Sequence, residues 1–130
     1  MYRFRLLIIE GDVSVLGLFA NLFASSNYHV DTCNDGECAI RTLSSDARYD
    51  VILISYRVPG TNGVELVRLI RGMEHRSRTP VLMVSGSGDI EDEAFAAGVN
   101  RVLHKPLDMK FLLATVEELA RSSVHDGDGA

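Results

Sequence analysis

The sequence has no tryptophan, only three prolines and two cysteines, and no long hydrophobic run. A membrane helix needs about 18 consecutive apolar residues, and the first apolar stretch ends where Glu10 follows Ile9. That stretch is also too short for the core of a secretion signal. Cys33 and Cys38 match neither a paired CxxC metal site nor a disulfide framework, so we expect two reduced, packed thiols in a cytoplasmic protein.

Basic residues are fewer than acidic ones. Thirteen Lys and Arg against eighteen Asp and Glu give a net charge of −5. This balance argues against a nucleic-acid-binding protein, which needs a basic face, and gives no reason to expect membrane attachment. The 130 residues, 46% of them hydrophobic, are enough for one domain whose core needs neither metal nor disulfide.

Segments typical of buried strands and of amphipathic helices alternate along the chain. Strands are expected at 6–9, 28–33, 51–54, 81–84 and 99–104, and helical spacing occurs at 15–23, 36–43, 64–70, 89–97 and 108–121. These units predict an α/β, flavodoxin-like doubly wound fold with a five-stranded parallel sheet in the order 2-1-3-4-5 and helices on both faces. We place the domain at residues 1–121 and expect 122–130 to be a disordered tail or the start of a linker.

Polar residues follow four of the predicted strands. They are Glu10, Gly11 and Asp12 after the first strand, Ser55, Tyr56 and Arg57 after the third, Ser85, Gly86, Ser87 and Gly88 after the fourth, and Lys105 after the fifth. Ligands of such sheets bind at the carboxyl ends of the strands, beside the topological switch. We therefore expect these residues to surround one crevice.

Several motifs occur in a characteristic order between residues 4 and 121. They are the apolar run 6–9 before an acid cluster, 50–54 before the central acceptor position, 58–63, 80–86, 97–99 and 105–108. Together they resemble the receiver domain of bacterial two-component response regulators, which implies a role in signal transduction through a phosphorelay. In that family, acids after the first strand and an aspartate after the third bind Mg²⁺, and the aspartate accepts a phosphoryl group from a histidine kinase.

The resemblance also assigns the remaining roles in the crevice. A hydroxyl residue after the fourth strand and a lysine after the fifth contact the phosphoryl group, and these positions are occupied here by Ser85, followed by the small Gly86, and by Lys105. Their movement reshapes the surface of the fourth helix, fifth strand and fifth helix, which partners recognise. We expect Lys105 to form an ion pair with Glu10 across the crevice.

Three positions depart from the family pattern. Ser55 occupies the phosphoacceptor position, Gly11 replaces the main metal-binding acid between Glu10 and Asp12, and Val102 replaces the aromatic switch residue. We expect Asp12 to face the start of the next helix. A lone glutamate with a backbone carbonyl at Arg57 is a poor Mg²⁺ site, and a serine hydroxyl needs a base before it attacks phosphorus.

We therefore interpret the chain as a degenerate pseudo-receiver. It is expected to be no enzyme, to need no cofactor, to bind Mg²⁺ weakly or not at all, and to act independently of phosphorylation through protein contacts, homodimerisation included. One alternative is a phosphate or small-ligand site formed by Glu10, Ser55, Ser85 and Lys105, or phosphorylation of Ser55 by a kinase. A flavodoxin-like cofactor protein ranks last, because the acids at 10–12 would repel phosphate.

Two further polar segments are given structural interpretations. Arg68, Arg71, His75, Arg76 and Arg78 form a basic stretch that we expect to be a solvated face. The serine- and glycine-rich loop 85–88 precedes a helix start, where an anion can bind. Four acidic residues at 89–93 would repel that anion, so we expect no phosphate site there.

Overall fold

The computed structural model describes residues 1–128, with side chains as far as Ser123. The strands are β1 (Phe4–Ile9), β2 (Tyr28–Cys33), β3 (Val51–Ser55), β4 (Arg57–Val58), β5 (Thr61–Asn62), β6 (Val81–Ser85) and β7 (Arg101–His104). The helices are α1 (Val13–Ser25), α2 (Gly36–Leu43), α3 (Gly63–Gly72), α4 (Glu91–Ala97) and α5 (Met109–Asp128), with a 3₁₀ turn at Glu74–Arg76. Within the described backbone, no helix is both long and apolar enough to cross a bilayer.

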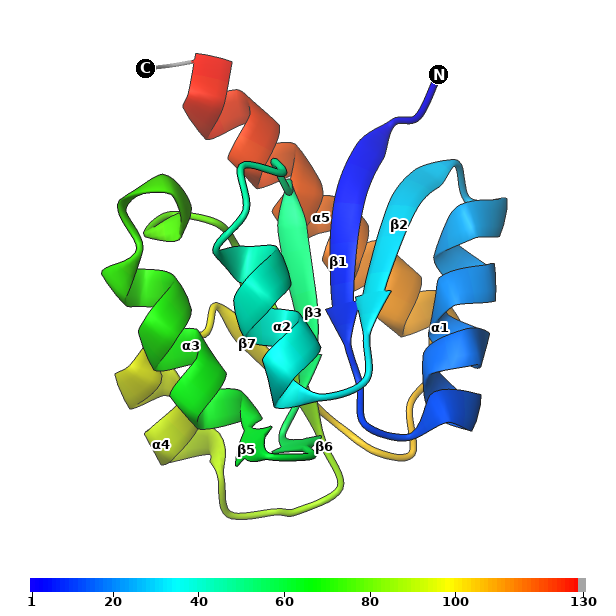
Figure 1. Cartoon of the computed structure of the whole chain (residues 1–130). Helices are drawn as coiled ribbons and strands as arrows, with labels where there is room; N and C mark the ends of the chain where they lie inside the picture. Colours follow the sequence, from blue (N-terminus) through cyan, green and yellow to red (C-terminus); the bar gives the residue numbers. More distant parts are fainter. Residues whose placement is uncertain (129–130) are drawn as a thin grey trace.

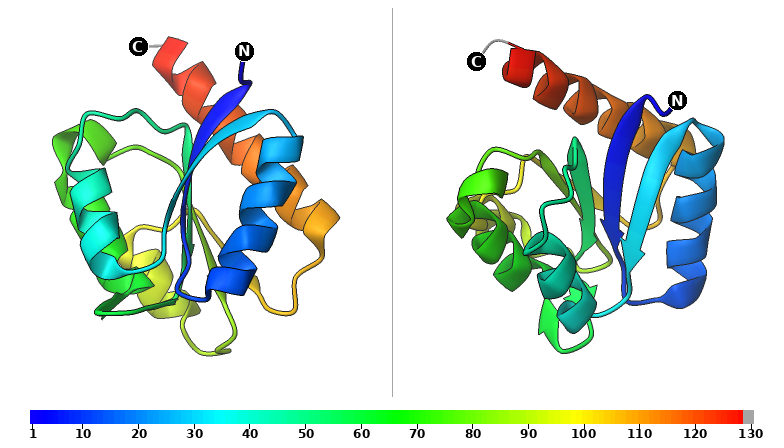
Figure 2. Two further views of the ribbon diagram at one scale, coloured as in Figure 1. Left: turned by 45° about the vertical axis from the view of Figure 1, so that its right-hand side comes forward. Right: turned by 45° about the horizontal axis from the view of Figure 1, so that its top comes forward.

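The five main strands form one parallel sheet in the order β2-β1-β3-β6-β7 (Figure 1). This is the predicted 2-1-3-4-5 order, since β6 and β7 are the fourth and fifth strands of the sheet. Helices α1 and α5 cover one face and α2, α3 and α4 cover the other (Figure 2). Every residue of β3 and β6 is buried, as expected of central strands covered on both faces.

Side chains at the helix starts define where α1 and α5 begin. The carboxylate of Asp12 accepts hydrogen bonds from the backbone N–H groups of Ser14, at 2.9 Å, and Val15, at 3.2 Å. Asp108 accepts equivalent bonds from Lys110 and Phe111. These caps satisfy N–H groups that have no partner within the helix, and they confirm both predicted helix starts.

Two elements differ from the sequence prediction. The turn residues Pro59–Gly63 belong in part to a small antiparallel hairpin of β4 and β5 over 57–62, and Gly60 takes a left-handed φ of 87° at its tip. Helix α5 continues to Asp128, past the expected end at Arg121. Residues 122–128 are therefore helical, where a disordered tail was expected. The domain boundary and the linker interpretation remain predictions, and residues 129–130 lie outside the described chain.

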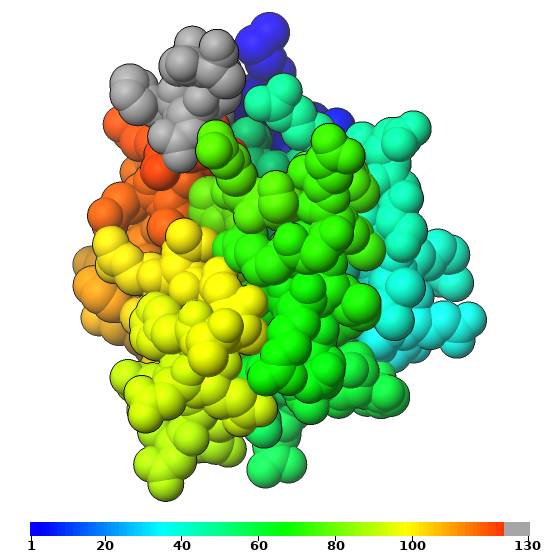
Figure 3. Space-filling view, turned by 90° about the vertical axis from the view of Figure 1, so that its left-hand side faces the viewer, coloured from blue at the N-terminus to red at the C-terminus, as the bar shows by residue number. Residues whose placement is uncertain are grey.

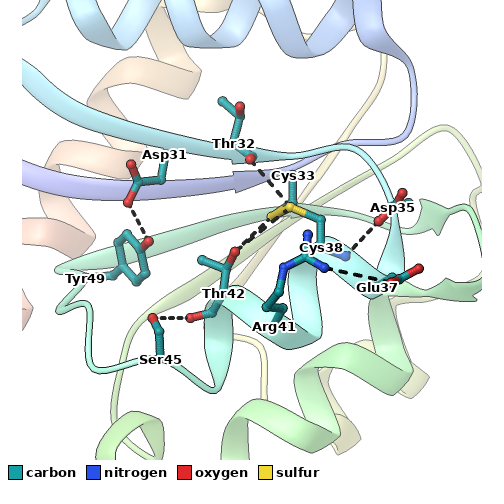
Figure 4. Close-up of a disulfide and its surroundings, with 10 residues drawn as sticks. All are labelled: Asp31, Thr32, Cys33, Asp35, Glu37, Cys38, Arg41, Thr42, Ser45 and Tyr49. Carbon is teal, nitrogen blue, oxygen red and sulfur yellow. Dashed lines mark hydrogen bonds and ion pairs between the residues drawn. A yellow bond between two sulfur atoms is a disulfide. The ribbon is translucent and has the colours of Figure 1, made fainter.

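The prediction of two reduced thiols is wrong. Cys33, at the end of β2, and Cys38, in the first turn of α2, form a disulfide with their Cα atoms 5.5 Å apart (Figure 4). The connection folds back because Asp35 caps α2 through the N–H of Cys38, at 2.8 Å. The spacing of the two cysteines along the sequence does not reveal this reversal, so the pairing was missed.

The expectation of a solvated basic face is wrong for two of its arginines. Arg71 is half-buried, and its guanidinium donates to the carbonyl oxygens of Gly98 and Thr79. Arg76 is only 2% exposed. Arg71 thus connects α3 to the end of α4, and these two helices lie side by side on the surface in Figure 3.

Candidate functional site

A small polar cluster lies at the carboxyl edge of the sheet. Ser55 donates a hydrogen bond from Oγ to Oε1 of Glu10 at 2.5 Å, and Nζ of Lys105 lies 3.2 Å from the same oxygen. The other oxygen, Oε2, accepts a bond from the backbone N–H of Asp12 at 3.0 Å. We call Glu10, Ser55 and Lys105 the edge cluster.

The strand register explains why these three residues meet. Ile9 of β1 pairs with Ile54 of β3, so Glu10 and Ser55 are the next residues on neighbouring parallel strands. Lys105 follows β7, and its backbone N–H donates to the carbonyl oxygen of Ser85 at 2.8 Å. The convergence predicted from the sequence is therefore present, and the expected contact between Lys105 and Glu10 forms.

The Glu10 carboxylate is 3% exposed. A buried carboxylate is stable only when positive charge and hydrogen-bond donors surround it. Here an ammonium, a hydroxyl and a backbone N–H supply them from three separate segments. The carboxylate oxygens that could bind a cation, and the ammonium group that could bind a phosphoryl oxygen, thus already contact each other within the chain.

The two residues after Glu10 do not enlarge this acidic group. Asp12 is exposed and caps α1, as predicted. At Gly11 a Cβ atom would lie 2.7 Å from Cδ of Pro59 and 3.1 Å from the carbonyl oxygen of Arg57. The hairpin therefore occupies the space that a side chain at position 11 would need, which the sequence did not predict.

The other predicted site residues lie around the same edge without joining the cluster. Ser85 is 2% exposed, and its hydroxyl donates to the Ser87 carbonyl at 3.1 Å and accepts from the Ser87 N–H at 2.9 Å. Gly86 is exposed, with open space around its Cβ position. Val102 is half-buried and packs against the core beneath α2, α3 and α4.

The residues present do not fit Mg²⁺, the ion that receiver domains bind. Mg²⁺ needs near-octahedral oxygen ligands and is usually held by one or two carboxylates. The available donors are one carboxylate, on Glu10, which already binds Lys105 and Ser55, together with the Arg57 carbonyl and the Ser55 hydroxyl. Among the side chains described, no group of three His, Cys, Asp or Glu residues is arranged to hold a metal.

Sequence reasoning missed Pro59 and Gly63, which shape this edge. The Gly63 N–H donates to the Tyr56 carbonyl at 2.7 Å, and a Cβ at Gly63 would overlap the Ser55 carbonyl oxygen. This glycine lets the start of α3 approach the end of β3 directly. The only signal in the sequence is the cluster of turn residues from Pro59 to Gly63.

Comparison with known proteins gives a consistent result. Residues 6–117 match the family described as "Response regulator receiver domain". The regulatory protein VanRB of Enterococcus faecalis is 34% identical over 121 residues, which cover 92% of this chain and 53% of that protein. The transcriptional regulatory protein ResD of Bacillus subtilis is 28% identical over 90% of this chain and 48% of its own length. This chain spans about half the length of these relatives.

Solved structures show the same likeness. The chemotaxis response regulator CheY4 of Vibrio cholerae superimposes with a TM-score of 0.82 at 27% identity, over 88% of this chain and 97% of that one. The receiver domain of the sensor histidine kinase PA1611 from Pseudomonas aeruginosa gives 0.82 at 25% identity, over 90% and 97% of the two chains. The matched family, the strand order and the solved structures agree, and the chain belongs to the receiver domains of two-component response regulators.

Proposed function

We propose that this receiver domain acts without phosphorylation of an aspartate and passes on its signal by protein contact. The observation that carries the proposal is the edge cluster. Ser55, at the acceptor position, donates a hydrogen bond from its hydroxyl group to Glu10, and Glu10 also forms an ion pair with Lys105. In this arrangement the lysine that meets a phosphoryl group in the family already has an anionic partner. The domain would thereby hold one conformation without phosphate.

The chemistry of the cluster supports this proposal. An aspartate is an anionic nucleophile, whereas a serine hydroxyl needs a base, and the carboxylate within reach of Ser55, that of Glu10, is already in contact with the Lys105 ammonium. The PA1611 receiver domain is described with a magnesium ion in its active-site cleft, but here the donor set does not suit that ion. We therefore propose a domain with no catalytic activity and no metal cofactor.

We also propose that the domain works in the cytoplasm, where two-component regulators meet their partners. The Cys33–Cys38 disulfide counts against this placement, because cytoplasmic reductants keep most thiols reduced. Cys33 lies beside the edge cluster, because the backbone N–H of Glu10 donates to its carbonyl oxygen at 3.0 Å. The contacts of Glu10 with Ser55 and Lys105 involve neither sulfur atom, so the proposal for the edge cluster does not require the disulfide.

The test is a titration with Mg²⁺ and beryllofluoride, a mimic of the phosphoryl group, followed by amide NMR. We expect no saturable shift at Ser55, Ser85 or Lys105 in the natural chain. The matched positive control is Gly11→Asp/Ser55→Asp/Pro59→Ala, in which the third change removes the ring atoms that a side chain at position 11 would meet. Saturable shifts in the natural chain would contradict the proposal, whatever the control does.

The proposed contact surface consists of α4, β7 and α5. Glu91 of α4 contacts His104 of β7, and Arg101 of β7 pairs with Glu118 of α5 at 2.9 Å. Phe95 lies four residues after Glu91, on the same side of α4, and is 48% exposed. An exposed aromatic ring surrounded by polar pairs is typical of a protein contact surface.

We expect Phe95→Asp to weaken self-association of the domain about fivefold or more, because loss of a central aromatic contact costs over about 1 kcal/mol. Sedimentation velocity over a concentration series measures this change. Ile40→Asp is the matched control, since Ile40 is 44% exposed on α2, outside the proposed surface. Equal weakening by both substitutions would contradict the assignment of the surface.

Phosphorylation of Ser55 is the second candidate. Its hydroxyl is within hydrogen-bonding distance of a carboxylate, which is the arrangement of a nucleophile and its base. Ser55 is only 2% exposed, so a kinase would first have to displace the covering loops. A phosphoserine at this position, found by mass spectrometry of the chain isolated from its native cell, would favour this candidate over the first.

A further inference from the structure

A second polar site lies at the opposite edge of the sheet, where the strands begin. It is a pocket of about 450 Å³ formed by the segment between α2 and β3, the segment after α3, and Ser123 of α5. The two segments, at 46–49 and 74–79, lie side by side at the upper end of the molecule in Figure 3. The pocket shares no residue with the edge cluster.

Arg76 is the most unusual residue of this pocket. It is 2% exposed, and its guanidinium donates from Nε to the Leu43 carbonyl at 2.7 Å and from Nη2 to the Ser45 carbonyl at 3.0 Å. Its guanidinium carbon lies 5.1 Å from the centre of the Tyr49 ring. These partners are all neutral, and burial lowers the pKa of Arg76.

No carboxylate among the described side chains lies within ion-pair distance of Arg76, and its Nη1 makes no hydrogen bond there. A buried charge is costly unless an opposite charge accompanies it. The surrounding carbonyl oxygens and aromatic face stabilise the cation only in part. The pocket thus contains a preformed positive centre without an anion.

Two more arginines, Arg48 and Arg78, line the same pocket and are exposed. Neither forms an ion pair with any described side chain, although Asp46 and Glu74 also line the pocket. Arginines elsewhere on the surface do pair, as Arg68 does with Glu65 and Arg101 with Glu118. The three arginines that converge on this pocket therefore share the lack of a described acidic partner.

We propose that this pocket binds a phosphate-bearing small molecule. The planar guanidinium group presents paired N–H donors that match phosphate oxygens, and Arg48 and Arg78 line the cavity with two such groups. Arg76 adds its buried positive charge, with its Nε and Nη2 donors already bound to carbonyl oxygens. The volume lies within the range of small-molecule sites, about 300–1,000 Å³, and exceeds what a single inorganic phosphate fills. The ligand class is therefore an organic phosphate, bound at the edge of the sheet opposite the edge cluster.

The test is an amide NMR titration of the full chain with ribose 5-phosphate and, separately, with inorganic phosphate at constant ionic strength. We expect saturable shifts at 46–49 and 75–79, with dissociation constants of about 1 mM or lower for ribose 5-phosphate. Arg48→Gln/Arg78→Gln should weaken binding about tenfold or more. Arg76 stays unchanged, because its replacement endangers the fold.

Two further variants test whether binding depends on these particular arginines and on an open pocket. Arg68→Gln/Arg121→Gln removes the same charge from arginines that are paired elsewhere, and it should leave binding unchanged. If this control weakens binding as much as Arg48→Gln/Arg78→Gln does, binding depends on the net charge of the chain and not on the pocket, and the proposal is overturned. The absence of saturable shifts in the natural chain would overturn it too. Asp126 and Asp128 follow Ser123 in the sequence. If ribose 5-phosphate binds to Asp126→Asn/Asp128→Asn and does not bind to the natural chain, the chain's own carboxylates occupy the pocket. That result would also overturn the proposal.

Discussion

Replacing Gly63 with alanine is expected to lower the free energy of unfolding by about 3 kcal/mol. A Cβ at this position would overlap the Ser55 carbonyl oxygen and would lie 2.9 Å from Cε of Met83. The methionine side chain can move, but the carbonyl belongs to the backbone at the end of β3. Relief of the overlap would require α3 to shift away from the sheet, and the N–H of Gly63 would then lose its bond to Tyr56.

Urea denaturation of the variant and the natural chain measures this effect. Gly72, the last residue of the same helix, provides the control, because no atom lies within 4 Å of its Cβ position. Gly72→Ala should leave stability unchanged or raise it by up to about 1 kcal/mol, since alanine loses less backbone entropy on folding. A Gly63→Ala midpoint equal to that of Gly72→Ala would contradict the close approach of α3 and β3.

Arg71→Met is expected to cost about 3 kcal/mol, because it leaves several carbonyl groups without their donor. Arg71 donates from Nη1 to the Thr79 carbonyl at 2.7 Å, and from Nε and Nη2 to the Gly98 carbonyl at 2.9 and 2.8 Å. Gly98 ends α4 with a left-handed φ of 117°. One side chain therefore fixes the end of α4 against the loop that leads into β6.

Arg68→Met, one helical turn earlier, is the matched control for Arg71→Met. Arg68 is exposed, and its one ion pair among the described side chains is with Glu65 on the same helix, so its replacement should change stability by about 0.5 kcal/mol or less. Thermal unfolding of both variants under identical conditions makes the comparison. If both shift the transition equally, the hydrogen bonds of Arg71 do not hold these segments together.

Local signals made most of the fold predictable. Continuous apolar runs marked the central strands β3 and β6, which are buried throughout, and Asp12 was expected at the start of α1, which it caps. The alternation of strands and helices then indicated a parallel sheet with helices on both faces, and the flavodoxin-like doubly wound class supplied the strand order.

The features that the sequence did not reveal depend on contacts between distant segments. Burial of Arg76 requires the carbonyls of Leu43 and Ser45, which come from the end of α2 and the loop after it. The Cys33–Cys38 disulfide depends on how tightly the chain reverses between β2 and α2. Composition and periodicity describe single segments, so they carry no information about contacts between two segments.

The edge cluster was predictable for a different reason. Glu10, Ser55 and Lys105 each follow a strand directly, and parallel strands end at a common edge, so their convergence follows from topology. The position of Pro59 against Gly11 depends instead on the exact path of the β4–β5 hairpin. No pattern in the sequence specifies that path.

The contact between Pro59 and Gly11 also constrains how this domain can evolve. An acid introduced at position 11 would place its Cβ 2.7 Å from the proline ring, so the β4–β5 hairpin would have to shift to admit it. That change alone restores no phosphoacceptor, because Ser55 would remain. Descendants of this protein would therefore regain an aspartate-based switch only through changes at positions 11 and 55 together with a movement of the hairpin, and neither substitution alone would provide a working switch.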